Sequence, residues 1–320
     1  MNKTTRREAL IGAAALAFSR QVFAKASQPS TAVNFAVPAN ACDTHTHIFG
    51  DPAKFPFWSG RVYTPEPALP AEMAALHRAL HLERVVIVTP SIYGTDNSAT
   101  IYGMKAYGPG ARGVAVIGDK TSEADLDTMA RAGFKGIRIN LTTVGQDNAA
   151  LARTRFQAAI ERVKSRRWHI QMYVSPAVIA AIKDLVMASP VPVVFDHFGG
   201  IDTAHGLTQP GFPDLIDLVR SGKAYVKISG AYRASMKAPD YPDLAPFAKA
   251  LIAANADRIV WGTDWPHPNS NPPPGRAATE LNPVYQIDDG HLLNLLPVWA
   301  SDAAVRKKIL VDNPTRLYEY

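Results

Sequence analysis

The chain has 320 residues, of which 47% are hydrophobic and 19% are charged, and its formal net charge is +6. This composition suits one large globular domain or two small ones, and the single cysteine, Cys42, excludes an intrachain disulfide. We find no basic stripe with interleaved aromatic residues, so nucleic-acid binding has no support, and no apolar run of about 18 residues or more, so no membrane span is expected.

The N-terminus has the layout of a secretion signal. A basic start with Arg6 and Arg7 precedes an apolar run over 9–18, and small residues follow up to Ala26. The apolar run is too short to anchor the chain in a bilayer. The adjacent arginines resemble a twin-arginine export signal. We therefore predict a signal peptide of twin-arginine type over 1–26 and a periplasmic location, with a disordered basic tail as the alternative.

Most of the positive charge lies in this predicted signal. Residues 1–26 hold five basic residues and one acidic residue, so the rest of the chain carries a formal net charge of +2 rather than +6. The charge of the whole chain therefore says little about the mature protein. The next segment, 27–34, consists mostly of small and polar residues and is expected to be a linker to a single domain over 35–320.

Beyond this linker, short apolar runs alternate with longer segments of helical periodicity. Strands are expected at 41–47, 84–90, 113–118, 136–141, 169–175, 192–197, 224–229 and 258–264. Helices are expected at 72–80, 122–133, 147–166, 177–188, 211–222 and 241–255.

This alternation predicts the fold. Strands separated by helices pair in parallel through crossover connections, and eight such units in about 250 residues match the size of a (β/α)8 barrel. The predicted fold class is therefore α/β, a single-domain TIM barrel. An open doubly wound sheet is the alternative, and the absence of G-x-G-x-x-G after the first strand weakens its dinucleotide-binding form.

Polar side chains gather at the ends of the predicted strands, where the active site of such a barrel lies. Because alternate residues of a strand point the same way, the imidazoles of the H-x-H motif are expected to share one site. The candidate site residues are His45, His47, Ser91, Arg138, Tyr173, His197, Arg233 and Asp264.

Each candidate also has a purely structural interpretation. His197 can serve only as a hydrogen-bond partner of a neighbouring loop. Asp264, in WGTDWPHP, can cap the turn that follows, and Arg138 can pair with a surface acid. Cys42 is expected to be a small buried hydrophobic residue.

The motifs together resemble the amidohydrolase superfamily, in the branch that includes lactonases acting on 2-pyrone-4,6-dicarboxylate and related lactones. The resemblance covers nearly the whole mature chain. It is carried by DTHTHIFG, PSIYGTDN, GFKGIRINL, WHIQMYVS, VVFDHFGG, VKISGAYR, IVWGTDWPHP and ILVDNPTRLY.

The resemblance implies roles for four residues. His45 and His47 match the metal-ligand pair of the first strand, His197 the histidine of the sixth, and Asp264 the aspartate of the eighth. Asp264 would take a proton from the attacking water, since a carboxylate is ionised at neutral pH. The same four residues are suited to one Zn²⁺ or Mn²⁺ ion. Without an obligatory metal, the histidines would stabilise the oxyanion themselves.

The resemblance also implies a substrate-binding set. Arg138 and Arg233 match arginines that bind substrate carboxylates, a task that suits a planar guanidinium. Ser91 and Tyr173 match positions that line the substrate pocket.

Two features depart from the family pattern. The fourth and fifth strands lack the bridging lysine or histidine of members with two metals, so a binuclear site is not expected. The loop INLTTVGQDN lacks an arginine that lactonases for pyrone dicarboxylate carry. This second departure counts against that substrate more than against the reaction.

The resulting hypothesis is an enzyme that hydrolyses a carboxylated lactone from sugar-acid or aromatic catabolism. The alternatives on the same site are a lactone isomerase and a metal-dependent decarboxylase. A protein that only binds an acidic metabolite is the non-catalytic alternative, because a fold by itself does not determine function.

Overall fold

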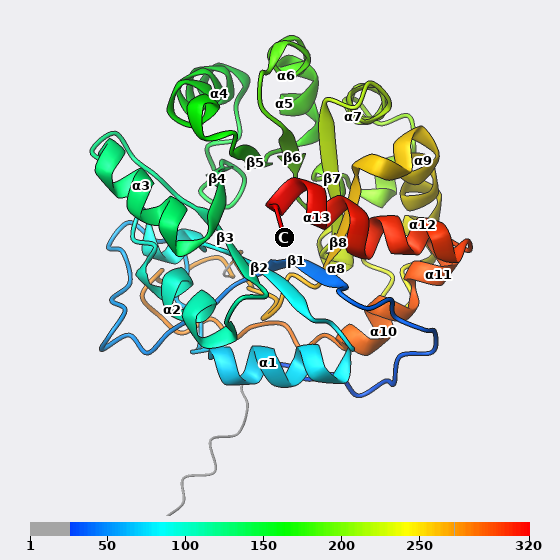
Figure 1. Cartoon of the computed structure of the whole chain (residues 1–320), viewed down its shortest axis with the longest axis horizontal. Helices are drawn as coiled ribbons and strands as arrows, with labels where there is room; N and C mark the ends of the chain where they lie inside the picture. The colour runs from blue at the N-terminus through cyan, green and yellow to red at the C-terminus, as the bar shows by residue number, and fades with distance from the viewer. Residues whose placement is uncertain (1–25, 272) are drawn as a thin grey trace, which may run out of the picture.

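The computed structural model describes residues 26–271 and 273–320, which form one barrel with helices around it (Figure 1). Its eight strands form a single sheet in chain order, and all the neighbouring pairs are parallel. The strands are β1 (Cys42–Thr46), β2 (Arg84–Val88), β3 (Ala111–Ala115), β4 (Phe134–Asn140), β5 (His169–Tyr173), β6 (Val193–Phe195), β7 (Ala224–Ser229) and β8 (Ile259–Gly262).

The sheet closes where the end of β8 meets the end of β1. The backbone N–H of His47 donates to the carbonyl of Trp265 at 2.8 Å, and the N–H of Asp264 donates to the carbonyl of His45 at 2.8 Å. Gly262 permits this close approach, because a Cβ there would lie 2.8 Å from the backbone nitrogen of His45. The predicted single-domain (β/α)8 barrel is confirmed.

Helices cover the outside of the barrel. They are α1 (Pro70–Ala79), α2 (Ser98–Tyr107), α3 (Glu123–Ala132), α4 (Ala149–Val163), α5 (Pro176–Ala181), α6 (Lys183–Ala188), α7 (Phe212–Arg220), α8 (Ala231–Ala234), α9 (Ala245–Asn255), α10 (Asp289–Asn294), α11 (Leu296–Trp299), α12 (Ala303–Lys307) and α13 (Asn313–Tyr318). The helix expected over 177–188 is two helices, because the backbone of Ile182 leaves the helical region at their junction.

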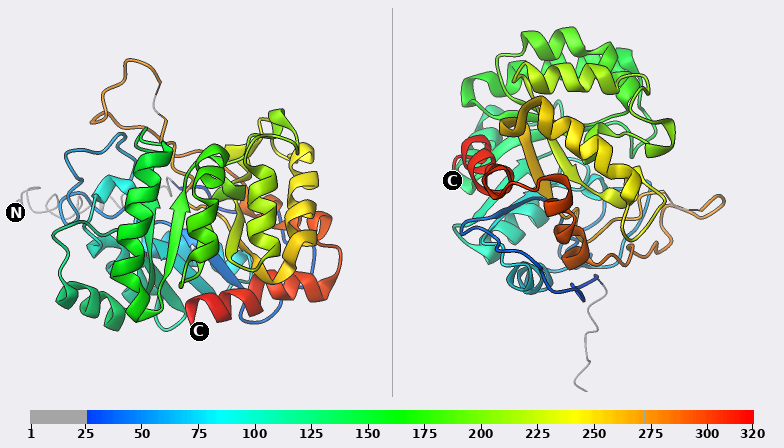
Figure 2. Two further views of the ribbon diagram at one scale, coloured as in Figure 1. Left: turned by 90° about the horizontal axis from the view of Figure 1, so that it is seen from above. Right: turned by 90° about the vertical axis from the view of Figure 1, so that its right-hand side faces the viewer.

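The end of the barrel where the strands begin is closed by apolar side chains. Cys42, Val86 and Val260 belong to one buried cluster there, together with Leu317 and Tyr318 of α13. Cys42 is fully buried, as predicted. The C-terminal helices lie at this end, and the loop after β8 projects from the opposite end (Figure 2). The functional groups at the strand ends therefore face away from the closed end.

The segment expected to be a linker, 27–34, forms no helix or strand but is held against the barrel. The hydroxyl of Ser27 lies 3.1 Å from Nδ1 of His267, and the hydroxyl of Ser30 donates to Asp288 at 2.6 Å. The predicted signal peptide lies outside the described residues apart from its last position. The signal and the periplasmic location therefore stay predictions.

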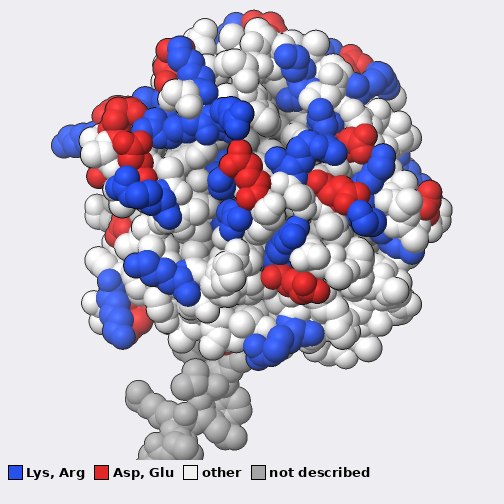
Figure 3. All heavy atoms as spheres, in the orientation of Figure 1, with Lys and Arg blue, Asp and Glu red and all other residues white. Residues whose placement is uncertain are grey.

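The exposed surface carries charges of both signs. On the face shown in Figure 3, Lys and Arg side chains are interspersed with Asp and Glu side chains. Among the described residues, no helix combines the length and the apolar character that a bilayer crossing requires.

Gly136 on β4 gives a direct test of the barrel packing. A Cβ at this position would lie 2.4 Å from Cε1 of His169, a buried ring on β5. We expect Gly136→Ala to lower the free energy of unfolding by about 1–3 kcal/mol, the usual cost of overpacking a core. Denaturant unfolding measures the change. In a His169→Ala background the same substitution should cost much less, and an equal cost in both backgrounds would contradict the packing described here.

Candidate active site

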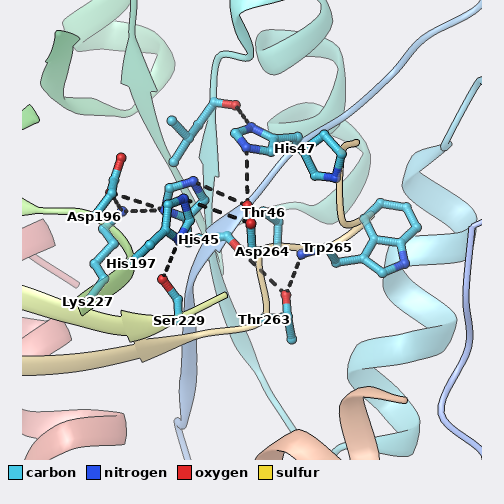
Figure 4. Close-up of polar contacts among 12 residues, drawn as sticks. His45, Thr46, His47, Asp196, His197, Lys227, Ser229, Thr263, Asp264 and Trp265 are labelled. Carbon is cyan, nitrogen blue, oxygen red and sulfur yellow. Dashed lines mark hydrogen bonds and ion pairs between the residues drawn. The ribbon is translucent and has the colours of Figure 1, made fainter. Parts of the chain in front are cut away.

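His45 and His47 lie at the end of β1, and an irregularity in that strand directs them. Cys42 packs into the apolar end of the barrel, so strict alternation from it would turn both histidines outward. The register of β1 against β2 shifts between Asp43 and Thr46. Both imidazoles consequently face the barrel interior, with their ring centroids 5.0 Å apart (Figure 4). The two histidines share one side, as alternation predicts, but the register shift turns that side toward the interior.

His197 and Asp264 follow β6 and β8 and complete a four-residue cluster with these histidines (Figure 4). Oδ1 of Asp264 lies 3.7 Å from Nε2 of His45 and 3.6 Å from Nε2 of His47. Its Oδ2 lies 3.8 Å from Nε2 of His197. All four side chains are buried. The structure therefore brings together the four residues predicted to be catalytic.

The hydrogen bond of His47 defines where its proton lies. Nδ1 of His47 is 2.7 Å from the carbonyl of Val88, which can only accept, so Nδ1 carries the proton. Nδ1 of His45 lies 3.2 Å from Oδ1 of Asp196, an acceptor, and 3.4 Å from Nζ of Lys227, a donor, so these contacts do not fix its proton. His47 therefore presents the lone pair of Nε2 to the site. Among the described residues, neither Nε2 of His45 nor Oδ1 of Asp264 has a hydrogen-bond partner.

Asp264 is held by two donors that act on one of its oxygens. Oδ2 accepts from Nε of Arg233 at 2.6 Å and from the hydroxyl of Tyr232 at 2.7 Å. Burial alone would raise the pKa of Asp264, but the charge of Arg233 holds it well below its usual value. The carboxylate is therefore ionised, with Oδ1 directed at the histidines. Tyr232 is not among the site residues predicted from the sequence. The only feature of the sequence that points to it is its position beside Arg233.

A second polar layer lies beneath the cluster, and the sequence analysis did not assign it a role. Oδ2 of Asp196 accepts from Nε of Arg138 and from Nε2 of Gln171, both at 3.0 Å. Lys227 is fully buried and donates to Oε1 of Gln171 at 2.7 Å and to the carbonyl of Thr44 at 2.8 Å. Burial lowers the pKa of Lys227 to about 8.

The strand pattern carried a signal for this layer. Gln171 and Lys227 each stand two residues before a side chain that faces the site, Tyr173 and Ser229, so alternation places them inside the barrel as well.

Burial alone would raise the pKa of Asp196, but the nearby cations, including Lys227, hold it well below its usual value.

The four residues predicted to bind substrate line one narrow cavity above the cluster. Ser91, Arg138, Tyr173 and Arg233 share it with His47, His197 and Asp264. The loop after β8 contributes Pro268 and Ser270. Tyr63 also lines this cavity and was not predicted.

Comparison with known proteins decides the family. Residues 42–320 match the Amidohydrolase family. The chain belongs to this family. This amidohydrolase is 35% identical to 4-sulfomuconolactone hydrolase of Rhizobium radiobacter, over 90% of this chain and 93% of the relative.

Two further relatives extend the comparison. The chain is 33% identical to 2-pyrone-4,6-dicarboxylate hydrolase of Comamonas testosteroni, over 92% of this chain and 94% of the relative. It is 28% identical to D-galactarolactone isomerase of Agrobacterium fabrum, over 90% of this chain and 94% of the relative. The homologues are thus lactone hydrolases or isomerases. The predicted resemblance and the enzyme class are confirmed.

The family implies a metal ion, and the residues of this amidohydrolase fit one. Ligand atoms of His45, His47 and Asp264 all lie within 4.8 Å of one another. The lone pair of Nε2 of His47 and the carboxylate oxygen of Asp264 repel one another unless a cation lies between them. This set of nitrogen and oxygen donors suits Zn²⁺ or Mn²⁺.

A second set, formed by His45, Asp196 and His197, has equally close ligand atoms. There the ammonium of Lys227 already lies 3.7 Å from Oδ1 of Asp196 and 3.4 Å from Nδ1 of His45. A divalent cation would be repelled by this charge. The arrangement therefore favours a single ion, in agreement with the expectation that the site is not binuclear.

Proposed function

We propose that this amidohydrolase hydrolyses a carboxylated lactone. The observation that carries the proposal is the placement of an ionised Asp264, the imidazoles of His47 and His197 and two guanidinium groups around one cavity, with His45 buried against Asp264. Its relatives act on lactones, which supports the same reaction class. The reaction is attack of water on the ring carbonyl and release of the ring oxygen.

Each residue then has a definite task. Oδ1 of Asp264 accepts a proton from the attacking water, because Oδ2 is already occupied by Arg233 and Tyr232. His45 and His47 would hold a divalent ion together with Asp264. When bound, that ion polarises the carbonyl and lowers the pKa of water. The tautomer of His47, with its proton on Nδ1, favours this metal-binding role over that of a bare oxyanion donor.

His197 differs from the other two imidazoles. Its Nδ1 lies 3.0 Å from the hydroxyl of Ser229, which can donate as well as accept. His197 can therefore carry its proton on Nε2, which faces the site, and donate it to the developing oxyanion. Burial lowers the pKa of His197 to about 4, so the ring is neutral near pH 7.

The two arginines explain a preference for acidic substrates. Arg138 and Arg233 both line the cavity, and each is held through its Nε by a buried carboxylate. Nη2 of Arg233 also donates to the carbonyl of Pro268 at 3.0 Å. A guanidinium in this fixed orientation can present its remaining N–H groups to a substrate carboxylate. The loop INLTTVGQDN contributes no further arginine, so we propose a substrate other than 2-pyrone-4,6-dicarboxylate.

A lactone isomerase is the second candidate, and one relative with that activity favours it. In this reaction a hydroxyl of the substrate takes the place of water, and Asp264 accepts its proton instead. The two reactions differ in their products, because hydrolysis releases an acid and isomerisation does not.

A panel of lactones with and without a carboxylate tests the proposal on the full chain. We expect acid release, followed with a pH indicator, from the carboxylated lactones only. A strong chelator should abolish the release, and added Zn²⁺ or Mn²⁺ should restore it. Conversion to a second lactone without acid release would favour the isomerase. No conversion of any carboxylated lactone would contradict both functions.

A further inference from the structure

A large groove adjoins the active-site cavity and has no part in the chemistry described above. It has a volume of about 1050 Å³ and lies at the ends of β2, β3 and β4 and along α4. Pockets for small molecules usually measure about 300–1,000 Å³. The groove therefore has room for a substantial chemical group.

The groove shares lining residues with the active-site cavity. Ser91, Arg138 and Asn140 line both of them. Arg138 is one of the two arginines proposed to bind the substrate carboxylate. A lactone whose carboxylate lies at Arg138 can therefore extend a ring substituent past Ser91 and Asn140 into the groove.

The lining of the groove is apolar and aromatic. Ile137 and Ile139, on the outer side of β4, and Val116 and Ile117, beyond β3, contribute aliphatic side chains. Trp58 also lines it and is 48% exposed, which is unusual for the largest aromatic side chain. An exposed indole beside aliphatic side chains offers a face on which an aromatic group can stack.

The groove is lined by three arginines, Arg138, Arg155 and Arg162, and by two aspartates, Asp96 and Asp119. Each arginine has a partner within the protein: Arg138 donates to Asp196, Arg155 to the side chain of Gln146 and Arg162 to the carbonyl of Thr121. The aliphatic side chains and Trp58 are the groups of the groove that can recognise an uncharged substituent.

We propose that this groove binds an apolar, preferably aromatic, substituent of the substrate, so that the preferred substrate class is an aryl-substituted carboxylated lactone. This inference rests on the proposed function. The carboxylate orients the ring at Arg138, and the substituent displaces water from the groove and packs against Trp58.

The experiment compares two probes, a carboxylated γ-lactone and the same lactone with a phenyl substituent on the ring. We expect the native enzyme to show a kcat/KM about tenfold or more higher for the phenyl lactone. Ala158→Trp fills the groove from an exposed position on α4 and should abolish this preference. Trp58→Ala removes the stacking face and should reduce it.

Ala150→Trp is the matched control, since Ala150 is exposed on the same helix and does not line the groove. It should retain the native preference. Equal kcat/KM for the two probes in the native enzyme, or a preference that survives Ala158→Trp, would overturn the groove inference while leaving lactone hydrolysis intact. A change of oligomeric state on gel filtration in Ala158→Trp, with unchanged preference, would also overturn it. Failure to hydrolyse either probe would refute the proposed function, and the inference with it.

Discussion

Asp264→Asn should lower kcat for lactone hydrolysis by about 10³-fold, within the range that a positioned general base contributes. The amide of asparagine has the same shape as the carboxylate but cannot accept a proton from water. Oδ2 of Asp264 already accepts from Arg233 and Tyr232, so only Oδ1 is available for this task. Substrate binding depends chiefly on the arginines, so the affinity should change far less than kcat.

The measurement combines initial rates with calorimetric binding of a carboxylated lactone, and with the metal content of the variant. Asp289→Asn is the control, because Asp289 is an equally buried carboxylate that pairs with His267 at 3.0 Å instead of the site histidines. It should retain nearly native turnover. An Asp264→Asn variant with native kcat would show that another group activates the water.

Lys227→Met should lower the free energy of unfolding by about 3 kcal/mol, the cost expected when one partner of a buried ionic network is removed. Methionine approximates the length of the lysine stem but donates no hydrogen bond. The carbonyl of Thr44 and Oε1 of Gln171 would lose their donor, and Asp196 would lose one nearby cation. Buried oxygens without a partner are costly because no water replaces the lost contact.

Denaturant unfolding of the native protein and of Lys227→Met provides the measurement. Lys223→Met is the matched control. Lys223 is exposed and directly precedes β7. Its substitution should therefore change the free energy of unfolding by no more than about 0.5 kcal/mol. Equal stabilities for Lys227→Met and the native protein would show that the polar layer contributes little to the fold.

Much of the fold followed from local patterns. Each of the expected apolar runs overlaps a strand, although β3 and β4 begin two residues earlier than predicted. The expected helices are also present, because both periodicities are local properties of the chain. The helix α2 was not among those expected. Its sequence SATIYGMKAY contains Gly103, which weakens helical propensity, and the glycine is needed because a Cβ would lie 2.6 Å from the side chain of Ile48. Packing against Ile48, which follows β1, and against Ile87 of β2 selects this residue, not propensity.

The sequence by itself determined the fold class and the end of the barrel at which the functional groups gather, because parallel strands all end on the same side. For that reason seven of the eight predicted site residues line one cavity, and the eighth, His45, lies against Asp264 beside it. Only the tertiary structure decided the inward direction of His45 and His47, which depends on a register shift against β2. It alone also revealed the contacts of Lys227 and Tyr232 and the groove beside α4. These features depend on distances between separate strands, and no local pattern encodes such distances.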